Sequence, residues 1–186
     1  MMKTIRKTAI VMLLFVYFLT YGVLPQVLAA GKDTPMIVVA HRAGAKVAPE
    51  NTLAALKQAI RDGAPIAKID VQQLSDGTLI VMHDSNFKRT AGEDVCVWDT
   101  EADVLSTLEV GSTFSAAYRG EQIPTLEEML ACAGGRIALM IELKYTGQEQ
   151  KLEENVLALL QEYDMMDECI IGSMNKGILQ RVRELE

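Results

Sequence analysis

The sequence predicts an α/β fold with a largely parallel sheet. Short apolar runs alternate with amphipathic segments from residue 36 to the last residue, 186. This alternation is typical of strand–helix units, in which helices cover a parallel sheet. The 186 residues are 49% hydrophobic and 23% charged, as in one ordinary globular domain, and we place that domain at residues 36–186.

The first strand–helix unit carries a histidine between its two elements. Residues 36–40 form an apolar, partly β-branched run directly before His41, as expected of a buried parallel strand. Asn51 or Thr52 is expected to cap a helix that continues to Arg61. The carboxyl end of such a strand is where α/β enzymes place their chemistry.

A β-hairpin is predicted next, between strands at residues 66–74 and 79–82. The dipeptide Asp76-Gly77 separates the two runs, and Asp-Gly is a strong signal for a two-residue turn.

That two-residue loop makes a geometric prediction about three polar residues. It places Asp70 directly opposite His83, and Lys68, two residues before Asp70, on the same face. The alternative interpretation is a surface hydrogen bond on an ordinary hairpin.

The remaining chain continues the alternation. Residues 86–122 look like an insertion with one short helix near 101–108, and Thr125 and Glu128 have the spacing of a capping box at the start of a helix. The later strands and helices are expected in turn at 137–143, 151–163, 169–172 and 176–185. The sequence thus holds about five strands, whereas a closed parallel barrel needs eight.

Residues 1–30 read as a targeting segment. Lys3, Arg6 and Lys7 precede a mostly apolar run at 9–24, and small residues suited to cleavage follow. The segment is a signal peptide or, alternatively, a retained anchor that contacts the membrane through residues 9–24. Either alternative predicts a secreted or extracytoplasmic domain, with or without membrane attachment.

Charge and cysteine content narrow the function classes. There are 25 acidic and 18 basic residues, and this acidic excess argues against a nucleic-acid partner. Cys96, Cys132 and Cys169 lack the close spacing of a zinc site or a redox pair. We expect them to be buried small hydrophobic residues or incidental thiols.

The chain has only two histidines, His41 and His83, and each follows an apolar strand. Two imidazoles can serve as acid and base near neutral pH. Arg42 adds a planar fork of donors suited to a phosphate, although a His-Arg pair alone is also common as a packed or exposed polar pair.

Glu142 and Lys144 alternate at the end of the strand predicted at 137–143 and therefore share one face. Charges at that position must be solvated, paired or bound to a metal ion. A mutual ion pair is the simpler alternative to a role in binding.

Eight short motifs occur in one order along the chain. They are His41-Arg42-Ala43-Gly44, Pro49-Glu50-Asn51-Thr52, Gly63-Ala64, Asp70-Val71-Gln72, Asp76-Gly77, His83-Asp84, Ile123-Pro124-Thr125-Leu126-Glu127-Glu128 and Glu142-Leu143-Lys144. Each motif alone is weak, but the set in this order and spacing is specific. The chain from residue 36 to 186 therefore resembles the glycerophosphodiester phosphodiesterase family.

This resemblance implies an irregular, TIM-barrel-like eight-stranded fold, related to the phospholipase C type of phosphodiesterase barrel. It implies hydrolysis of small-molecule glycerophosphodiesters to glycerol 3-phosphate and an alcohol, by acid/base catalysis assisted by Ca²⁺ or Mg²⁺. In that arrangement His41 and His83 are the general acid and base, and Arg42 and Lys144 lie at the phosphate.

The resemblance also implies a metal site built from Asp70 and Glu142, with Glu50 holding the metal-binding or glycerol-binding loop. Oxygen ligands suit Ca²⁺ and Mg²⁺. In the family, however, the residue two before the metal-binding aspartate is usually a glutamate, and here it is Lys68. Replacing a carboxylate by an ammonium should lower metal affinity steeply.

Three interpretations of Lys68 remain open. The substitution inactivates the site, or Lys68 itself supplies the positive charge in place of metal, or Lys68 turns outward and Glu50 substitutes as a ligand. The sequence also ends after five strands, so we expect an incomplete, C-terminally truncated barrel. A catalytically inactive, phosphodiester-binding domain is therefore the alternative to the enzyme.

Overall fold

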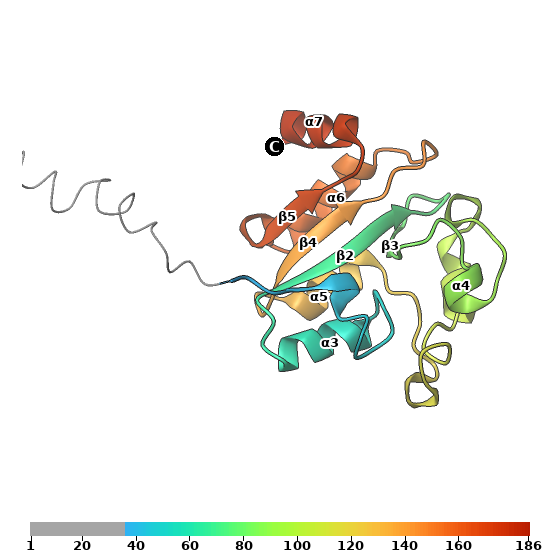
Figure 1. Ribbon diagram of the computed structural model, residues 1–186. Helices are drawn as coiled ribbons and strands as arrows, with labels where there is room; N and C mark the ends of the chain where they lie inside the picture. The colour runs from blue at the N-terminus through green and yellow to red at the C-terminus, as the bar shows by residue number, and fades with distance from the viewer. Residues whose placement is uncertain (1–35) are drawn as a thin grey trace, which may run out of the picture. The chain divides into compact units, whose positions relative to one another are not determined.

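The computed structural model describes residues 36–186, and a five-stranded sheet lies at their centre (Figure 1). β1, β2, β4 and β5 are parallel and adjacent in that order, and β3 pairs antiparallel with β2. The strands are β1 Val39–Ala40, β2 Ile66–Gln73, β3 Leu79–Val81, β4 Ala138–Leu143 and β5 Cys169–Gly172. The predicted α/β class with five strands is confirmed.

Two of the helices, α3 and α5, begin at capping residues that the sequence identified. Thr52 accepts a hydrogen bond from the Ala55 amide at 3.2 Å, and Thr125 and Glu128 form the predicted capping box. The α-helices are α3 Leu53–Arg61, α4 Lys88–Ala91, α5 Leu126–Ala133, α6 Leu152–Glu162 and α7 Lys176–Leu185. Short 3₁₀ turns add η1 His41–Ala43, η2 Val97–Asp99, η3 Ala102–Thr107, η4 Ala116–Tyr118 and η5 Met166–Glu168.

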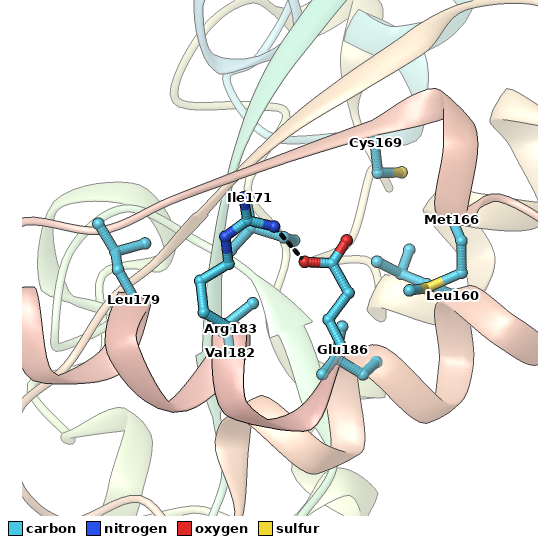
Figure 2. A pocket seen from close by; sticks show the side chains of 9 residues that line it. Leu160, Met166, Cys169, Ile171, Leu179, Val182, Arg183 and Glu186 are labelled. Carbon is cyan, nitrogen blue, oxygen red and sulfur yellow. Dashed lines mark hydrogen bonds and ion pairs between the residues drawn. The ribbon is translucent and has the colours of Figure 1, made fainter.

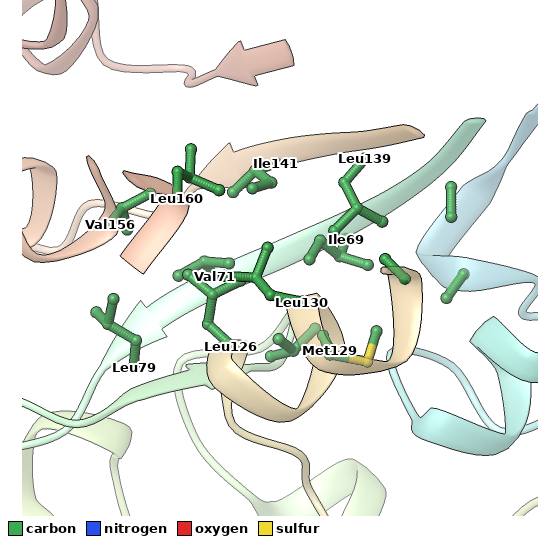
Figure 3. Packing of buried hydrophobic residues seen from close by; sticks show 14 of the residues in the cluster. Ile69, Val71, Leu79, Leu126, Met129, Leu130, Leu139, Ile141, Val156 and Leu160 are labelled. Atoms are coloured by element: carbon green, nitrogen blue, oxygen red, sulfur yellow. The ribbon is translucent and has the colours of Figure 1, made fainter. Parts of the chain in front are cut away.

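One face of the sheet is apolar and packs against helices. Figure 3 shows Leu126 and Leu130 of α5 beneath Val71 of β2 and Ile141 of β4. Because side chains alternate along a strand, the charged residues of β2 and β4 lie on the other face. The helix-covered core thus presents a row of charged side chains on the opposite side of the sheet.

The hairpin register differs from the prediction by one residue. Asp70 lies opposite Met82, whose amide donates to the Asp70 carbonyl at 2.8 Å, and not opposite His83. The loop has three residues, because the Leu74 amide already bonds the Thr78 carbonyl at 2.9 Å. Asp76 stabilises this wider loop by accepting from the amides of Thr78 and Ala102.

Two further elements differ from the expected bounds. β1 covers only Val39–Ala40, and the helix expected near 101–108 is the 3₁₀ turn η3. The predicted insertion packs onto the hairpin through its own apolar cluster, which includes Phe87, Val97 and Ile80. This second cluster anchors α4, which bears a residue of the site described below.

The predicted signal peptide or anchor at residues 1–30 lies outside the described residues. Between residues 36 and 186, no helix is both long enough and apolar enough to span a membrane.

Leu130 tests the central packing of the sheet, because its side chain is fully buried between α5 and the strands. Leu130→Ala is expected to lower the free energy of unfolding by about 3 kcal/mol, measured by urea denaturation. Leu185, which is 47% exposed, gives the matched control, and Leu185→Ala should change stability by less than about 0.5 kcal/mol. Equal losses in the two variants would contradict this packing.

Candidate active site

Four charged side chains meet at the polar face of β2 and β4. Lys68 contacts the carboxylate of Asp70 and lies 2.5 Å from Oε2 of Glu142. The ammonium of Lys144 lies 3.1 Å from Asp70 and 2.7 Å from Glu142. Asp70 and Glu142 are register partners in the two parallel strands, so the backbone pairing itself brings the carboxylates together.

Asp70 is the buried centre of this group, with no exposed surface. Burial alone would raise the pKa of Asp70, but hydrogen bonds from Lys68 and Asn51 and the charge of Lys144 outweigh it and hold the pKa at about 2. The Asn51 side chain binds both the side chain and the backbone of Asp70. Its Nδ2 donates to Asp70 Oδ2 at 3.0 Å, and its Oδ1 accepts from the Asp70 backbone amide at 3.3 Å.

The turn after β1 has an unusual backbone. Arg42 and Ala43 adopt positive φ angles of 50° and 60°, which residues other than glycine rarely do. Such conformations cluster at functional sites. The Arg42 carbonyl accepts from the Asn51 amide at 2.9 Å, so the turn is tied to the residue that binds Asp70.

The Arg42 guanidinium is only partly satisfied. Its Nη1 donates to Glu50 at 2.9 and 3.1 Å, while its buried Nε has no hydrogen-bond partner within residues 36–186. A buried, unpaired donor is costly, and an anionic ligand would satisfy it. This observation agrees with the predicted place of Arg42 beside a phosphate.

His83 belongs to a second chain of contacts. Its Nδ1 lies 2.8 Å from Asp84 Oδ1, and Arg89 of α4 donates to Asp84 Oδ2 at 2.6 Å and to Glu50 at 2.5 Å. The hydrogen bond from Arg89, helped by His83, holds the pKa of Asp84 at about 2 despite partial burial. Glu50 is thereby engaged by Arg42 and Arg89 and lies in this chain of contacts, separate from the Asp70–Glu142 pair.

Two positioning residues were missed by the sequence reasoning. Gln72, buried on β2, donates from Nε2 to the carbonyls of Met82 and Asp84 at 2.8 and 2.7 Å, and so fixes the backbone around His83. Its place two residues after Asp70 could have indicated the shared face. Arg89 lies in the insertion, where no pattern in the sequence marked it.

His41 is exposed and begins η1, directly after the β1 residue Ala40, which pairs with Ala67 of β2. This pairing brings His41 to the level of Lys68 along the sheet. Among residues 36–186, no hydrogen bond joins the His41 ring to another side chain. The predicted partnership of His41 and His83 therefore stays a prediction.

A cavity of about 770 Å³ opens beside these groups. It is lined by residues that include Gln72, His83, Asp84, Glu142, Lys144 and Ser173. A second pocket of about 370 Å³ lies among α6, β5 and α7 (Figure 2). Its lining is mainly apolar, and its ionic pair, Arg183 and Glu186, is at the surface, so the charged cavity is the candidate active site.

The side chains present do not fit a divalent cation. Asp70 and Glu142 already share two ammonium groups, and no cluster of three or more His, Cys, Asp or Glu side chains between residues 36 and 186 could hold a metal ion. An ammonium about 4 Å from a divalent ion repels it by roughly 8 kcal/mol at an effective dielectric of about 20. Lys68 points inward, toward Asp70 and Glu142. The alternative in which Lys68 turns outward and Glu50 replaces it as a metal ligand is therefore wrong, because Glu50 pairs with Arg42 instead.

The described residues thus form a mainly parallel α/β sheet with acidic and basic side chains near the carboxyl ends of its strands and an imidazole beside them. Residues 41–186 match the Glycerophosphoryl diester phosphodiesterase family, and the chain belongs to that family. Solved relatives have the same TIM-barrel-like fold. The family generally depends on a divalent metal ion.

Individual relatives agree with this assignment. The chain is 36% identical to a glycerophosphodiester phosphodiesterase of Caldanaerobacter subterraneus over 80% of its own length and 62% of the relative. The corresponding enzyme of Bacillus subtilis is 32% identical, with 81% and 56% covered. An Oleispira antarctica phosphodiesterase solved with sn-glycerol-3-phosphate has a TM-score of 0.76 and 31% identity, with 81% and 62% covered. The chain thus spans about three fifths of the length of these relatives.

The low pKa of Asp70 predicts an acid-dependent loss of stability. Because the pKa is about 2 in the folded chain and about 3.9 in an unfolded one, its contribution of about 3 kcal/mol is complete above pH ~5 and is lost as pH falls through 2. The free energy of unfolding, measured by urea denaturation at several pH values across this range, should change less steeply with pH in Asp70→Asn than in the unmodified chain. Asp167→Asn, at an exposed site, should keep the slope; an unchanged slope in Asp70→Asn would contradict the assignment.

Proposed function

We propose that the chain carries the catalytic groups of a glycerophosphodiester phosphodiesterase, which releases glycerol 3-phosphate and an alcohol. The observation that carries this proposal is the cavity in which His83 faces the same space as Glu142 and Lys144. Membership of the family and the activity for which its relatives are named support the same reaction.

Two cationic side chains of the site are assigned to the phosphate group of the substrate. Arg42 and Lys144 bind the phosphate oxygens, since both are cationic and Arg42 has an unpaired buried Nε among the described residues. Cationic groups at the phosphate oxygens withdraw electron density from the phosphorus atom, and they orient the ester for attack by water. Lys144 is held in place by both carboxylates of the strand pair.

His41 and His83 act as the general acid/base pair that transfers protons during hydrolysis. Hydrolysis breaks the bond between phosphorus and the alcohol oxygen, so one imidazole accepts a proton from the attacking water and the other donates one to the leaving alcohol. The Nδ1 of His83 is engaged by Asp84, which leaves Nε2 as its exchanging atom. Arg89 and Gln72 hold Asp84 and the adjoining backbone, and so fix the orientation of the ring.

Placement outside the cytoplasm is also part of the proposal. It is supported by the basic and apolar pattern of residues 1–30, as a cleaved signal or a membrane anchor.

Substitution of either histidine tests the catalytic assignment. His41→Ala and His83→Ala should each lower the rate of glycerol 3-phosphate release from glycerophosphocholine by at least about 100-fold, because proton transfer is lost. Lys57→Ala, at an exposed position on α3, should leave the rate unchanged. Hydrolysis that survives both histidine substitutions would contradict the roles. Absence of turnover in the folded, unmodified chain would favour the alternative, a noncatalytic phosphodiester-binding domain.

Arg42 tests the phosphate contact separately from proton transfer. Arg42→Met should raise KM for the same substrate by about tenfold or more, because the charged hydrogen bonds to the phosphate are lost. The matched control is Arg61→Met, since Arg61 is exposed and, within residues 36–186, its side chain bonds only Gln58 on its own helix. A KM unchanged in Arg42→Met would remove Arg42 from the substrate site.

A further inference from the structure

Lys68 lies where the two acidic side chains of the site converge. Its ammonium contacts Asp70 and is 2.5 Å from Oε2 of Glu142. The Lys68 side chain is only 12% exposed, so the ammonium is held inside the site and away from bulk solvent. One positive group therefore bridges both carboxylates, in the place that a cation bound between them would take.

The backbone fixes this placement. Lys68 and Asp70 are two residues apart on β2 and share a face, and Asp70 is in register with Glu142 on β4. The three side chains therefore start from adjacent positions in the middle of the sheet. Their contact is a consequence of strand pairing and does not depend on a mobile loop.

The charges of the group are balanced without a metal ion. Two ammonium groups, Lys68 and Lys144, face two carboxylates, so the formal sum is zero. A carboxylate in place of Lys68 would make the sum −2, which a divalent cation would neutralise. The lysine thus provides locally what the ion would bring: a positive charge between Asp70 and Glu142.

Donor geometry leaves room for an anion. Each ammonium has three N–H groups, and the contacts found within residues 36–186 occupy two on Lys68 and two on Lys144. Lys144 lines the cavity that contains His83. The unpaired Nε of Arg42 adds another donor in the described part of the chain.

We propose that this site binds the phosphate group of its ligand without a divalent cation, with the Lys68 ammonium in the role of the ion. The inference rests on the proposed function for its ligand class, a glycerophosphate or its diester. It departs from that function in predicting insensitivity to chelators, whereas the family generally depends on a divalent ion.

Calorimetric titration with sn-glycerol 3-phosphate tests the inference by binding alone. The unmodified chain should bind with the same Kd, within about twofold, in EDTA, Ca²⁺ or Mg²⁺. Neither ion alone should raise its melting temperature. Loss of binding in EDTA, or a clear rise in melting temperature with either ion, would overturn the inference.

Variants at residue 68 separate its charge from its size. Lys68→Met should weaken metal-free binding by at least about tenfold, and Lys68→Glu should make both melting temperature and binding depend on Ca²⁺ or Mg²⁺. Lys57→Met, an exposed lysine on α3, should behave as the unmodified chain. Should Lys68→Met fail to fold, Lys68→Arg supplies the test, because it keeps the charge and should retain metal-free binding. Metal-dependent binding in Lys68→Arg would overturn the inference.

Turnover measured in parallel distinguishes the two proposals. Metal-free binding with no hydrolysis of any glycerophosphodiester contradicts the proposed function and supports the cation replacement. Hydrolysis that appears only with Ca²⁺ or Mg²⁺ supports the function and overturns the cation replacement.

Discussion

A carboxylate with no exposed surface, in the centre of a parallel sheet, must be compensated by its neighbours. Asp70 is such a group, and Lys68, Lys144 and Asn51 supply the compensation. Breaking one of these contacts would leave the buried carboxylate less fully compensated. The compensation also organises the site: Asn51 connects Asp70 to the turn of Arg42, and Lys144 connects it to Glu142 and the cavity.

A second group of contacts orients the imidazole side of the cavity. Arg89 joins Asp84, which contacts His83, to Glu50, which in turn holds Arg42, so Arg42 and His83 belong to one network. α4 is held by the apolar cluster around Phe87, and this cluster therefore supports the site from the insertion. The same network gives Glu50 a structural role between two arginines.

Periodicity and capping signals were sufficient to predict the strands and four of the α-helices, α3, α5, α6 and α7, because apolar alternation and the Thr125–Glu128 capping box are local properties. The predicted pairing of Asp70 with His83 is wrong by one residue, because a contact from Ala102, far along the chain, favours a three-residue loop over a two-residue one. The shared face of Glu142 and Lys144 followed from alternation. The role of Arg89 depends on tertiary packing of an irregular segment, which no sequence period encodes.

The central claim is that the Lys68 ammonium takes the place of a divalent ion between Asp70 and Glu142. Anomalous diffraction from crystals soaked with Mn²⁺ and sn-glycerol 3-phosphate tests it most directly. Phosphate density should lie in contact with the two lysines, with no manganese peak between the carboxylates. A manganese peak there, with Lys68 displaced from Asp70, would contradict it.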